Sequence, residues 1–188
     1  MPKVPFRLLA ILSAVIAMLL SSAPVPRGEE PGTPAAGEAT EATPNPSRPG
    51  KTGLPLPRFV SLRAGEVNLR TGPGVRYPID WVYRRRDLPV EIIDEFDTWR
   101  RIRDWQGTLG WVHQSMLQGR RTILVVGEQR VLRRDPEDGA PGLAYATPGV
   151  IGEIKKCRGD WCKVVLEGFT GWLRKSNFYG AYGDEDAQ

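Results

Sequence analysis

The chain has 188 residues, including 21 glycines, 17 prolines, two cysteines and one histidine, and its formal net charge is +4. Because a nucleic-acid-binding protein concentrates its basic residues on one face, and acidic residues are interleaved with the basic ones here, we expect no nucleic-acid partner. The few Cys and His residues also argue against a metal centre, and no glycine-rich phosphate loop is present, so we expect no cofactor.

The first 23 residues have the pattern of a secretory signal, with a short basic start, an apolar run at 8–20 and small residues up to Ala23. This run is shorter than the roughly 20 residues that a membrane-spanning helix needs. Pro24 disfavours cleavage after Ala23, so we expect residues 1–23 to be either removed or retained as an anchor. In both cases the sequence predicts a periplasmic or exported protein, with no membrane contact except that anchor.

A spacer is expected next. Residues 24–57 are rich in Pro, Gly, Ala, Thr and Glu and have almost no aliphatic side chain before Leu54. Such a segment buries too little apolar surface to offset the entropy lost on ordering, so we predict a disordered linker. The Pro-Leu-Pro at 55–57 is either a polyproline ligand or, as we favour, the stiff end of this linker.

From residue 58 onwards, short strand signals follow one another closely. Strands are predicted at 59–62, 67–70, 77–83 and 88–93, followed by a hairpin at 99–112, with turns at 71–74, 94–97 and 106–107. No segment in this part has helical periodicity. Short strands at this spacing indicate a small β-barrel.

The hairpin has a second copy further along the chain. The sequences WRRIRDWQGTLGWV at 99–112 and WCKVVLEGFTGWL at 161–173 both run from Trp through an aliphatic residue and a glycine turn to Gly-Trp-aliphatic. Such self-similarity indicates a duplicated structural unit. We therefore divide the rest of the chain into a first module at 58–119, a second module at 120–179 and an acidic tail at 180–188.

The first module resembles the bacterial SH3-like domain, and specifically a tandem group found in exported proteins of Gram-negative bacteria. The resemblance is carried by Asn68-Leu69-Arg70, Gly72-Pro73, Tyr77-Pro78, Trp99, Ile102, Gly110-Trp111-Val112 and Leu117. It covers residues 58–179 and implies an all-β fold of two tandem barrels, each of five to six strands with a long loop after the first strand. In the second module Val131 replaces Asn68 and Asp135 replaces Gly72, so a ligand that needs either residue would bind only the first module.

Cys157 and Cys162 flank four residues that include a glycine, which is typical of a β-hairpin loop. The flanks of such a loop lie within disulfide range, and an exported protein meets oxidants, so we predict a Cys157–Cys162 disulfide. Two reduced thiols and a redox pair are the alternatives, although a redox pair usually has two intervening residues before a helix.

No catalytic residues are predicted. His113 is the single histidine, and its chain neighbours Gln114 and Ser115 do not supply the orienting acid that nucleophilic catalysis needs. We interpret His113 as a polar residue at the end of a strand, and we expect the protein not to be an enzyme.

Aromatic side chains are the candidate binding groups. Trp99 and Ile102 are three residues apart, so in a strand they point to opposite faces. With Ile102 in the core, Trp99 lies on the outer face beside the long loop, where Tyr77 and Trp81 can join it. Arg100 is a candidate for the rim of such a groove, where it would meet an acidic partner. The alternative is that these aromatic residues are core or shell residues of a small barrel.

We therefore predict a non-catalytic cell-envelope module that engages a cell-wall peptide or a partner protein through an aromatic groove. Domains resembling these often serve as cell-wall targeting modules, which supports this prediction by analogy. The alternative is a structural or accessory subunit that docks permanently on another envelope protein. The sequence leaves open whether one or both modules bind.

Overall fold

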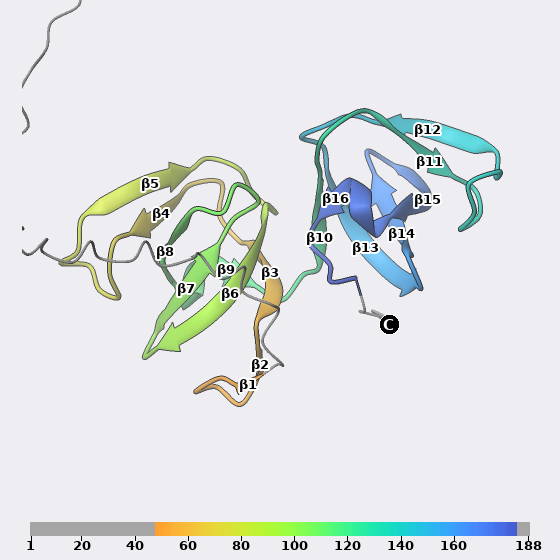
Figure 1. Ribbon diagram of the computed structural model, residues 1–188. Helices are drawn as coiled ribbons and strands as arrows, with labels where there is room; N and C mark the ends of the chain where they lie inside the picture. The colour runs from red at the N-terminus through yellow and green to blue at the C-terminus, as the bar shows by residue number, and fades with distance from the viewer. Residues whose placement is uncertain (1–47, 184–188) are drawn as a thin grey trace, which may run out of the picture. The chain divides into compact units, whose positions relative to one another are not determined.

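The computed structural model describes residues 48–183, which consist of β-strands and two short 3-10 turns (Figure 1). The predictions of a signal segment at 1–23, of most of the linker and of the end of the acidic tail lie outside the described residues. Nowhere in 48–183 is there a helix with the length and apolar character needed to cross a membrane.

The first barrel is an antiparallel sheet with the strand order β5-β4-β8-β7-β6-β3-β9. Its elements are β3 (Arg58–Leu62), β4 (Val67–Arg70), β5 (Ile79–Tyr83), β6 (Pro89–Phe96), β7 (Trp99–Arg103), β8 (Leu109–His113), η1 (Gln114–Met116) and β9 (Leu117–Gln118). The β6 strand runs further than predicted, so the turn expected at 94–97 is reduced to Asp97-Thr98, with Asp97 in the left-handed region at φ +50°. The predicted Gln106-Gly107 turn is present, with Gly107 at φ +86°.

The second barrel repeats this arrangement in the order β12-β11-β15-β14-β13-β10-β16. Its elements are β10 (Thr122–Val125), β11 (Arg130–Arg133), β12 (Gly142–Ala146), β13 (Ile151–Arg158), β14 (Trp161–Leu166), β15 (Phe169–Arg174), η2 (Lys175–Asn177) and β16 (Phe178–Tyr179). Each strand of one barrel has a counterpart at the same place in the other, which confirms the all-β fold and the duplication. Each sheet has seven strands rather than five to six.

Each barrel has its own aliphatic core, and the fully buried side chains come from equivalent strands. They are Leu62, Leu69, Ile102 and Val112 in the first barrel, and Ile123, Leu132, Val164 and Leu173 in the second. Burying one such side chain contributes about 1.5–3 kcal/mol relative to leaving it exposed. The alternation of inward and outward residues along these strands therefore fixes which face each neighbouring side chain occupies.

The Gly-Trp step of each repeat has a steric cause. A Cβ at Gly110 would lie 2.5 Å from Cγ of Leu69, and a Cβ at Gly171 would lie 2.6 Å from Cγ of Leu132. These distances are shorter than real Cβ contacts allow. The two leucines therefore pack directly on the glycine backbone, which is why a glycine precedes the tryptophan in each closing strand.

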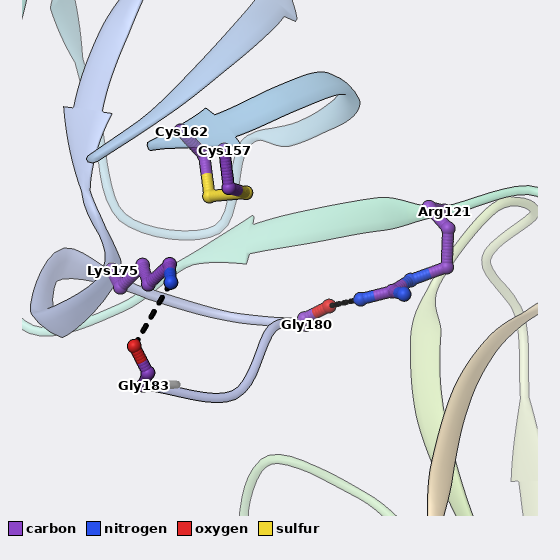
Figure 2. Close-up of a disulfide and its surroundings, with 6 residues drawn as sticks. All are labelled: Arg121, Cys157, Cys162, Lys175, Gly180 and Gly183. Carbon is purple, nitrogen blue, oxygen red and sulfur yellow. Dashed lines mark hydrogen bonds between the residues drawn. A yellow bond between two sulfur atoms is a disulfide. The ribbon is translucent and has the colours of Figure 1, made fainter. Parts of the chain in front are cut away.

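One pair of residues facing each other across the hairpin is linked differently in the two barrels. Cys157 and Cys162 are paired across β13 and β14 and form a disulfide, as predicted (Figure 2). In the first barrel the equivalent pair, beside Trp99 at the same step of the hairpin, is Glu95 and Arg100. Their side chains are buried, with 3.5 Å between Oε1 of Glu95 and Nε of Arg100. A covalent bond thus replaces a buried ion pair.

Ahead of the first barrel, β1 (Arg48–Pro49) and β2 (Pro55–Leu56) form a short hairpin. Leu56 is buried in the core of the first barrel, and Glu95 accepts hydrogen bonds from the backbone N of Thr52 at 2.9 Å and from its Oγ1 at 2.8 Å. The predicted linker therefore extends too far at its C-terminal end, because Leu56 and the hydrogen bonds from Thr52 hold this segment against the first barrel.

The two barrels belong to one compact unit and share contacts at their junction. Leu124 of β10 is buried in the core cluster of the first barrel, and Oγ1 of Thr122 donates a 2.8 Å hydrogen bond to the carbonyl oxygen of Asp87. Tyr182, in the segment predicted as an acidic tail, packs on Phe59 with 4.7 Å between ring centroids. The backbone on either side of Tyr182 is held by side chains, because Arg121 donates to the carbonyl oxygen of Gly180 and Lys175 donates to that of Gly183 (Figure 2).

Candidate functional site

A surface hollow of about 270 Å³ lies on the first barrel, and we call it the Trp99 pocket. One wall is formed by β4, the residue before it and the loop after it. The other wall is formed by the start of β7, the end of β8 and the η1 turn. The lining residues are Glu66, Asn68, Arg70, Val75, Trp99, His113, Ser115 and Met116. One aromatic ring therefore lies among carboxylate, amide, hydroxyl and imidazole groups.

Strand alternation places Trp99 in this pocket. Arg100 and Ile102 are the buried residues of β7, so Trp99 faces the other side and its side chain is half-buried. The register of β7 and β8 places His113 directly opposite, with 5.4 Å between the two ring centroids and 79° between the ring planes. This edge contact fixes the indole ring and leaves part of its surface available to a ligand.

His113 and Ser115 form a local cap rather than a catalytic pair. Nδ1 of His113 lies 2.7 Å from Oγ of Ser115 and accepts from the backbone N of Ser115 at 3.3 Å, which caps the η1 turn. Within residues 48–183 no carboxylate pairs with this imidazole, and no group of three or more His, Cys, Asp or Glu side chains is placed to hold a metal ion. The pocket offers ring stacking and hydrogen bonds.

The loop after β4 is held in shape by its own residues. Nη1 of Arg70 donates to the carbonyl oxygens of Val75 at 3.1 Å and Tyr77 at 2.7 Å. The Tyr77 ring lies so close to Gly72 that a Cβ there would be 2.4 Å from the ring. Gly72 of the predicted motif is thus required for the tyrosine to pack, and Tyr77 supports the loop that forms one wall of the pocket.

The structure separates the four residues that the sequence suggested as one groove. Trp99 lines the Trp99 pocket, and Tyr77 packs on Gly72 within the loop after β4. Trp81 is 56% exposed and lines a different hollow, of about 400 Å³, together with Trp105. Arg100 is only 5% exposed. The four do not form a single binding surface.

Arg100 is an interior structural group. It lies on the same face of β7 as Ile102, because residues two apart share a face of a strand. Its guanidinium donates to the carbonyl oxygen of Asp97 at 2.8 Å and to Oε1 of Gln114 at 2.6 Å, and it also faces Glu95. Because these partners occupy the guanidinium, we leave Arg100 out of the proposed site.

Sequence reasoning missed most of the polar lining. His113 was interpreted only as a strand-end residue, and Glu66, Asn68 and Ser115 were not considered as pocket residues. One signal was present for His113. Given the Gln106-Gly107 turn, counting back along a regular hairpin brings the end of β8 opposite Trp99, to within one residue of the observed register.

In the second barrel the equivalent place is filled by the chain itself. Arg174 pairs across the strands with Trp161, as His113 pairs with Trp99, and its guanidinium lies 4.7 Å from the Trp161 ring centroid. Nε of Arg174 donates to Asp138 at 3.0 Å. This hydrogen bond raises the pKa of Arg174 and lowers the pKa of Asp138, so both groups stay charged. Trp161 is only 8% exposed.

Comparison with known proteins agrees with this duplicated architecture. The family model described as the bacterial SH3 domain matches twice, at residues 63–119 and 126–180. No curated protein matches the chain.

Among solved structures, NlpC2 and NlpC1 from Trichomonas vaginalis are similar at 12% and 11% identity, with TM-scores of 0.32 and 0.31. The matches cover 70% and 66% of this chain and 51% and 46% of theirs. An NlpC/P60 family protein from Bacillus cereus ATCC 10987 is similar at 14% identity, with a TM-score of 0.29, over 65% of this chain and 57% of its own. The chain thus spans about half the length of these proteins.

Proposed function

Because the chain belongs to the bacterial SH3 domain family, with two copies in tandem, we propose that it is a non-catalytic binding module of the cell envelope. The ligand is an extended cell-wall peptide, and it binds in the Trp99 pocket of the first barrel. The observation that carries this proposal is the partly buried indole of Trp99 lining a pocket among hydrogen-bonding side chains, beside a second barrel whose equivalent tryptophan is covered.

The chemistry of the pocket fits a short peptide. An aromatic ring gives a large contact surface at low entropic cost, while amide, hydroxyl and carboxylate groups around it can pair with the alternating donors and acceptors of an extended backbone. Asn68, Ser115 and Glu66 provide these groups. Cell-wall peptides are short and carry free amines and carboxylates, and the secretory pattern at 1–23 would bring the protein to them.

A different hollow supports the alternative of an accessory subunit docked on an envelope protein. Trp81 and Trp105 line it, and Trp81 is more than half exposed. Large exposed aromatic side chains are over-represented at protein interfaces. Under this alternative, the larger hollow rather than the Trp99 pocket would be the contact surface.

A pull-down on purified peptidoglycan separates the two functions. We expect the full chain to be retained at low salt, and Trp99→Ala to weaken retention about thirtyfold, because truncating a hot-spot aromatic residue costs about 2 kcal/mol or more. Trp81→Ala is the matched control and should bind like the unmodified chain. Loss of retention only in the Trp81 variant would place the peptide site in the larger hollow, and no retention of the unmodified chain would reject peptide binding and leave the accessory subunit.

A further inference from the structure

The duplication provides an internal comparison between two versions of one pocket. In both barrels a tryptophan begins the second strand of the same hairpin, and the residue opposite it ends the next strand. Trp99 faces His113, and Trp161 faces Arg174. The first version has an open indole, and the second has a guanidinium stacked on it.

The second pocket shows what this site accommodates. The guanidinium of Arg174 lies over the Trp161 ring, donates to Asp138 and comes within 3.9 Å of Oδ2 of Asp160. A cation on an aromatic face with carboxylates at its edge is a favourable arrangement for a group that retains its charge. The guanidinium of Arg174 thus occupies the second pocket.

The first pocket keeps the aromatic platform and lacks the occupant. His113 takes the place of Arg174. Val75 takes the place of Asp138, because Val75 follows Arg70 in the sequence by the same number of residues as Asp138 follows Arg133. A carboxylate is still present, because Glu66 lines the pocket.

Two charged side chains, Arg70 and Glu66, line the first pocket, and their partners decide which of them is accessible to a ligand. Arg70 is engaged by two loop carbonyl oxygens. Glu66 lies 3.8 Å from Nε of Arg84, but both side chains are largely exposed, and a surface pair of this kind contributes little. The Glu66 carboxylate is therefore accessible to a ligand.

We propose that the Trp99 pocket binds a ligand group equivalent to the guanidinium that Arg174 supplies within the second barrel. That group is an alkylammonium or guanidinium cation of a peptide, stacked on Trp99 and paired with Glu66. The inference rests on the proposed function, since it specifies the ligand chemistry of the same site. It also assigns binding to the first barrel alone.

The charge requirement is tested with two small probes on the full chain, Nα-acetyl-lysine N-methylamide and its Nε-acetylated form. The readout is the NMR shift of the Trp99 indole N–H, assigned by comparison with Trp99→Ala. We expect the charged probe to bind at least about fivefold more tightly than the acetylated one, and Glu66→Gln to remove most of that difference. Equal affinities, or no shift with either probe, would overturn the inference, whereas the proposed function stands or falls separately on peptidoglycan retention.

A graft between the barrels tests the same idea without depending on one probe. The double variant Val75→Asp with His113→Arg copies the pair Asp138–Arg174 into the first barrel, and we expect it to abolish binding of the lysine probe while the variant stays folded. Gln106→Arg introduces a guanidinium at the far end of the hairpin, away from the pocket, and is the control. In the reverse direction, Arg174→Ala should raise the stoichiometry from one probe to two by exposing Trp161. A folded double variant that binds like the unmodified chain would contradict the inference.

Discussion

At the scale of single residues, a buried carboxylate holds the turn between β7 and β8. Asp104 is 3% exposed and accepts hydrogen bonds from the backbone N of Gln106 at 2.9 Å and of Thr108 at 2.8 Å. It also accepts from the hydroxyl of Tyr83 at 3.0 Å. Burial, together with the charge of Asp104, raises the pKa of Tyr83, so its hydroxyl stays protonated and remains a donor. The turn that aligns Trp99 with His113 depends on this group.

We expect Asp104→Ala to lower the free energy of unfolding by about 3 kcal/mol, because it removes three hydrogen bonds and leaves the buried Tyr83 hydroxyl without a partner. Urea denaturation of the purified protein measures the change. The control is Asp80→Ala, which removes an exposed carboxylate from β5, the strand that carries Tyr83. Similar losses in the two variants would show that the buried hydrogen bonds are not responsible.

Glu95 gives the first barrel a specific dependence on pH. Burial alone would raise its pKa, but hydrogen bonds from Thr52 and Arg58 outweigh burial and hold the pKa of Glu95 below its usual value. A carboxyl group whose pKa is lower in the folded state stabilises the fold above its unfolded pKa and loses that contribution as the pH falls through the folded pKa. The stabilisation should therefore be complete at neutral pH and decline below about pH 4.5.

Melting temperatures measured from pH 7 down to pH 3 test this expectation. The unmodified chain should lose stability steeply below about pH 4.5, and Glu95→Gln should start less stable at pH 7 and lose less on acidification. Asp94→Asn changes a neighbouring, more exposed carboxylate and is the control. Parallel pH curves for the unmodified chain and Glu95→Gln would contradict the assignment.

At the scale of elements, the closing strands need glycine where Leu69 and Leu132 pack. We expect Gly110→Ala to destabilise the first barrel by about 1–3 kcal/mol, because the added methyl group overpacks the core against Leu69. Gly65→Ala is the matched control, since nothing lies within 4 Å of its Cβ position. Thermal unfolding followed by circular dichroism should show a lower midpoint only for Gly110→Ala, and an unchanged midpoint would show that Leu69 can move aside.

The strands and their duplication could be predicted because periodicity and turn residues are local signals. Gly107 marks a turn, and Ile102 marks the inner face of β7. The same rule of alternation, applied to Arg100, would have placed that residue inside. Its inner partner Glu95 comes from the preceding strand, so the ion pair becomes visible only once the register is known.

The composition of the Trp99 pocket was harder to predict, because its walls come from segments that meet only in the folded barrel. Glu66 and Asn68 lie far from Trp99 in sequence, and no periodicity within one strand relates them. The occupied second pocket was equally hidden. It depends on Arg174 reaching across the strands to Trp161 and on Asp138 arriving from a loop.

At the scale of the whole molecule, aromatic rings and buried charges join the two barrels. The Phe59 ring packs against Tyr179, with 5.0 Å between centroids, and against Tyr182. The hydroxyl of Tyr182 donates to Glu91 at 2.8 Å, and Glu91 is itself buried and paired with Arg103. These contacts pack the second barrel against the first.

This junction predicts cooperative unfolding of the two barrels. Contacts that bury aromatic surface between two domains make the unfolding of one depend on the other, so the unmodified chain should show one calorimetric transition, with equal calorimetric and van't Hoff enthalpies. Phe59→Ala removes the ring that Tyr179 and Tyr182 share, and it should split that transition into two, because each barrel retains its own core. Phe169→Ala, at a ring that is 54% exposed on the second barrel, should leave one transition. A single unshifted transition in the Phe59 variant would mean that the backbone connection and the remaining polar contacts are enough to couple the barrels.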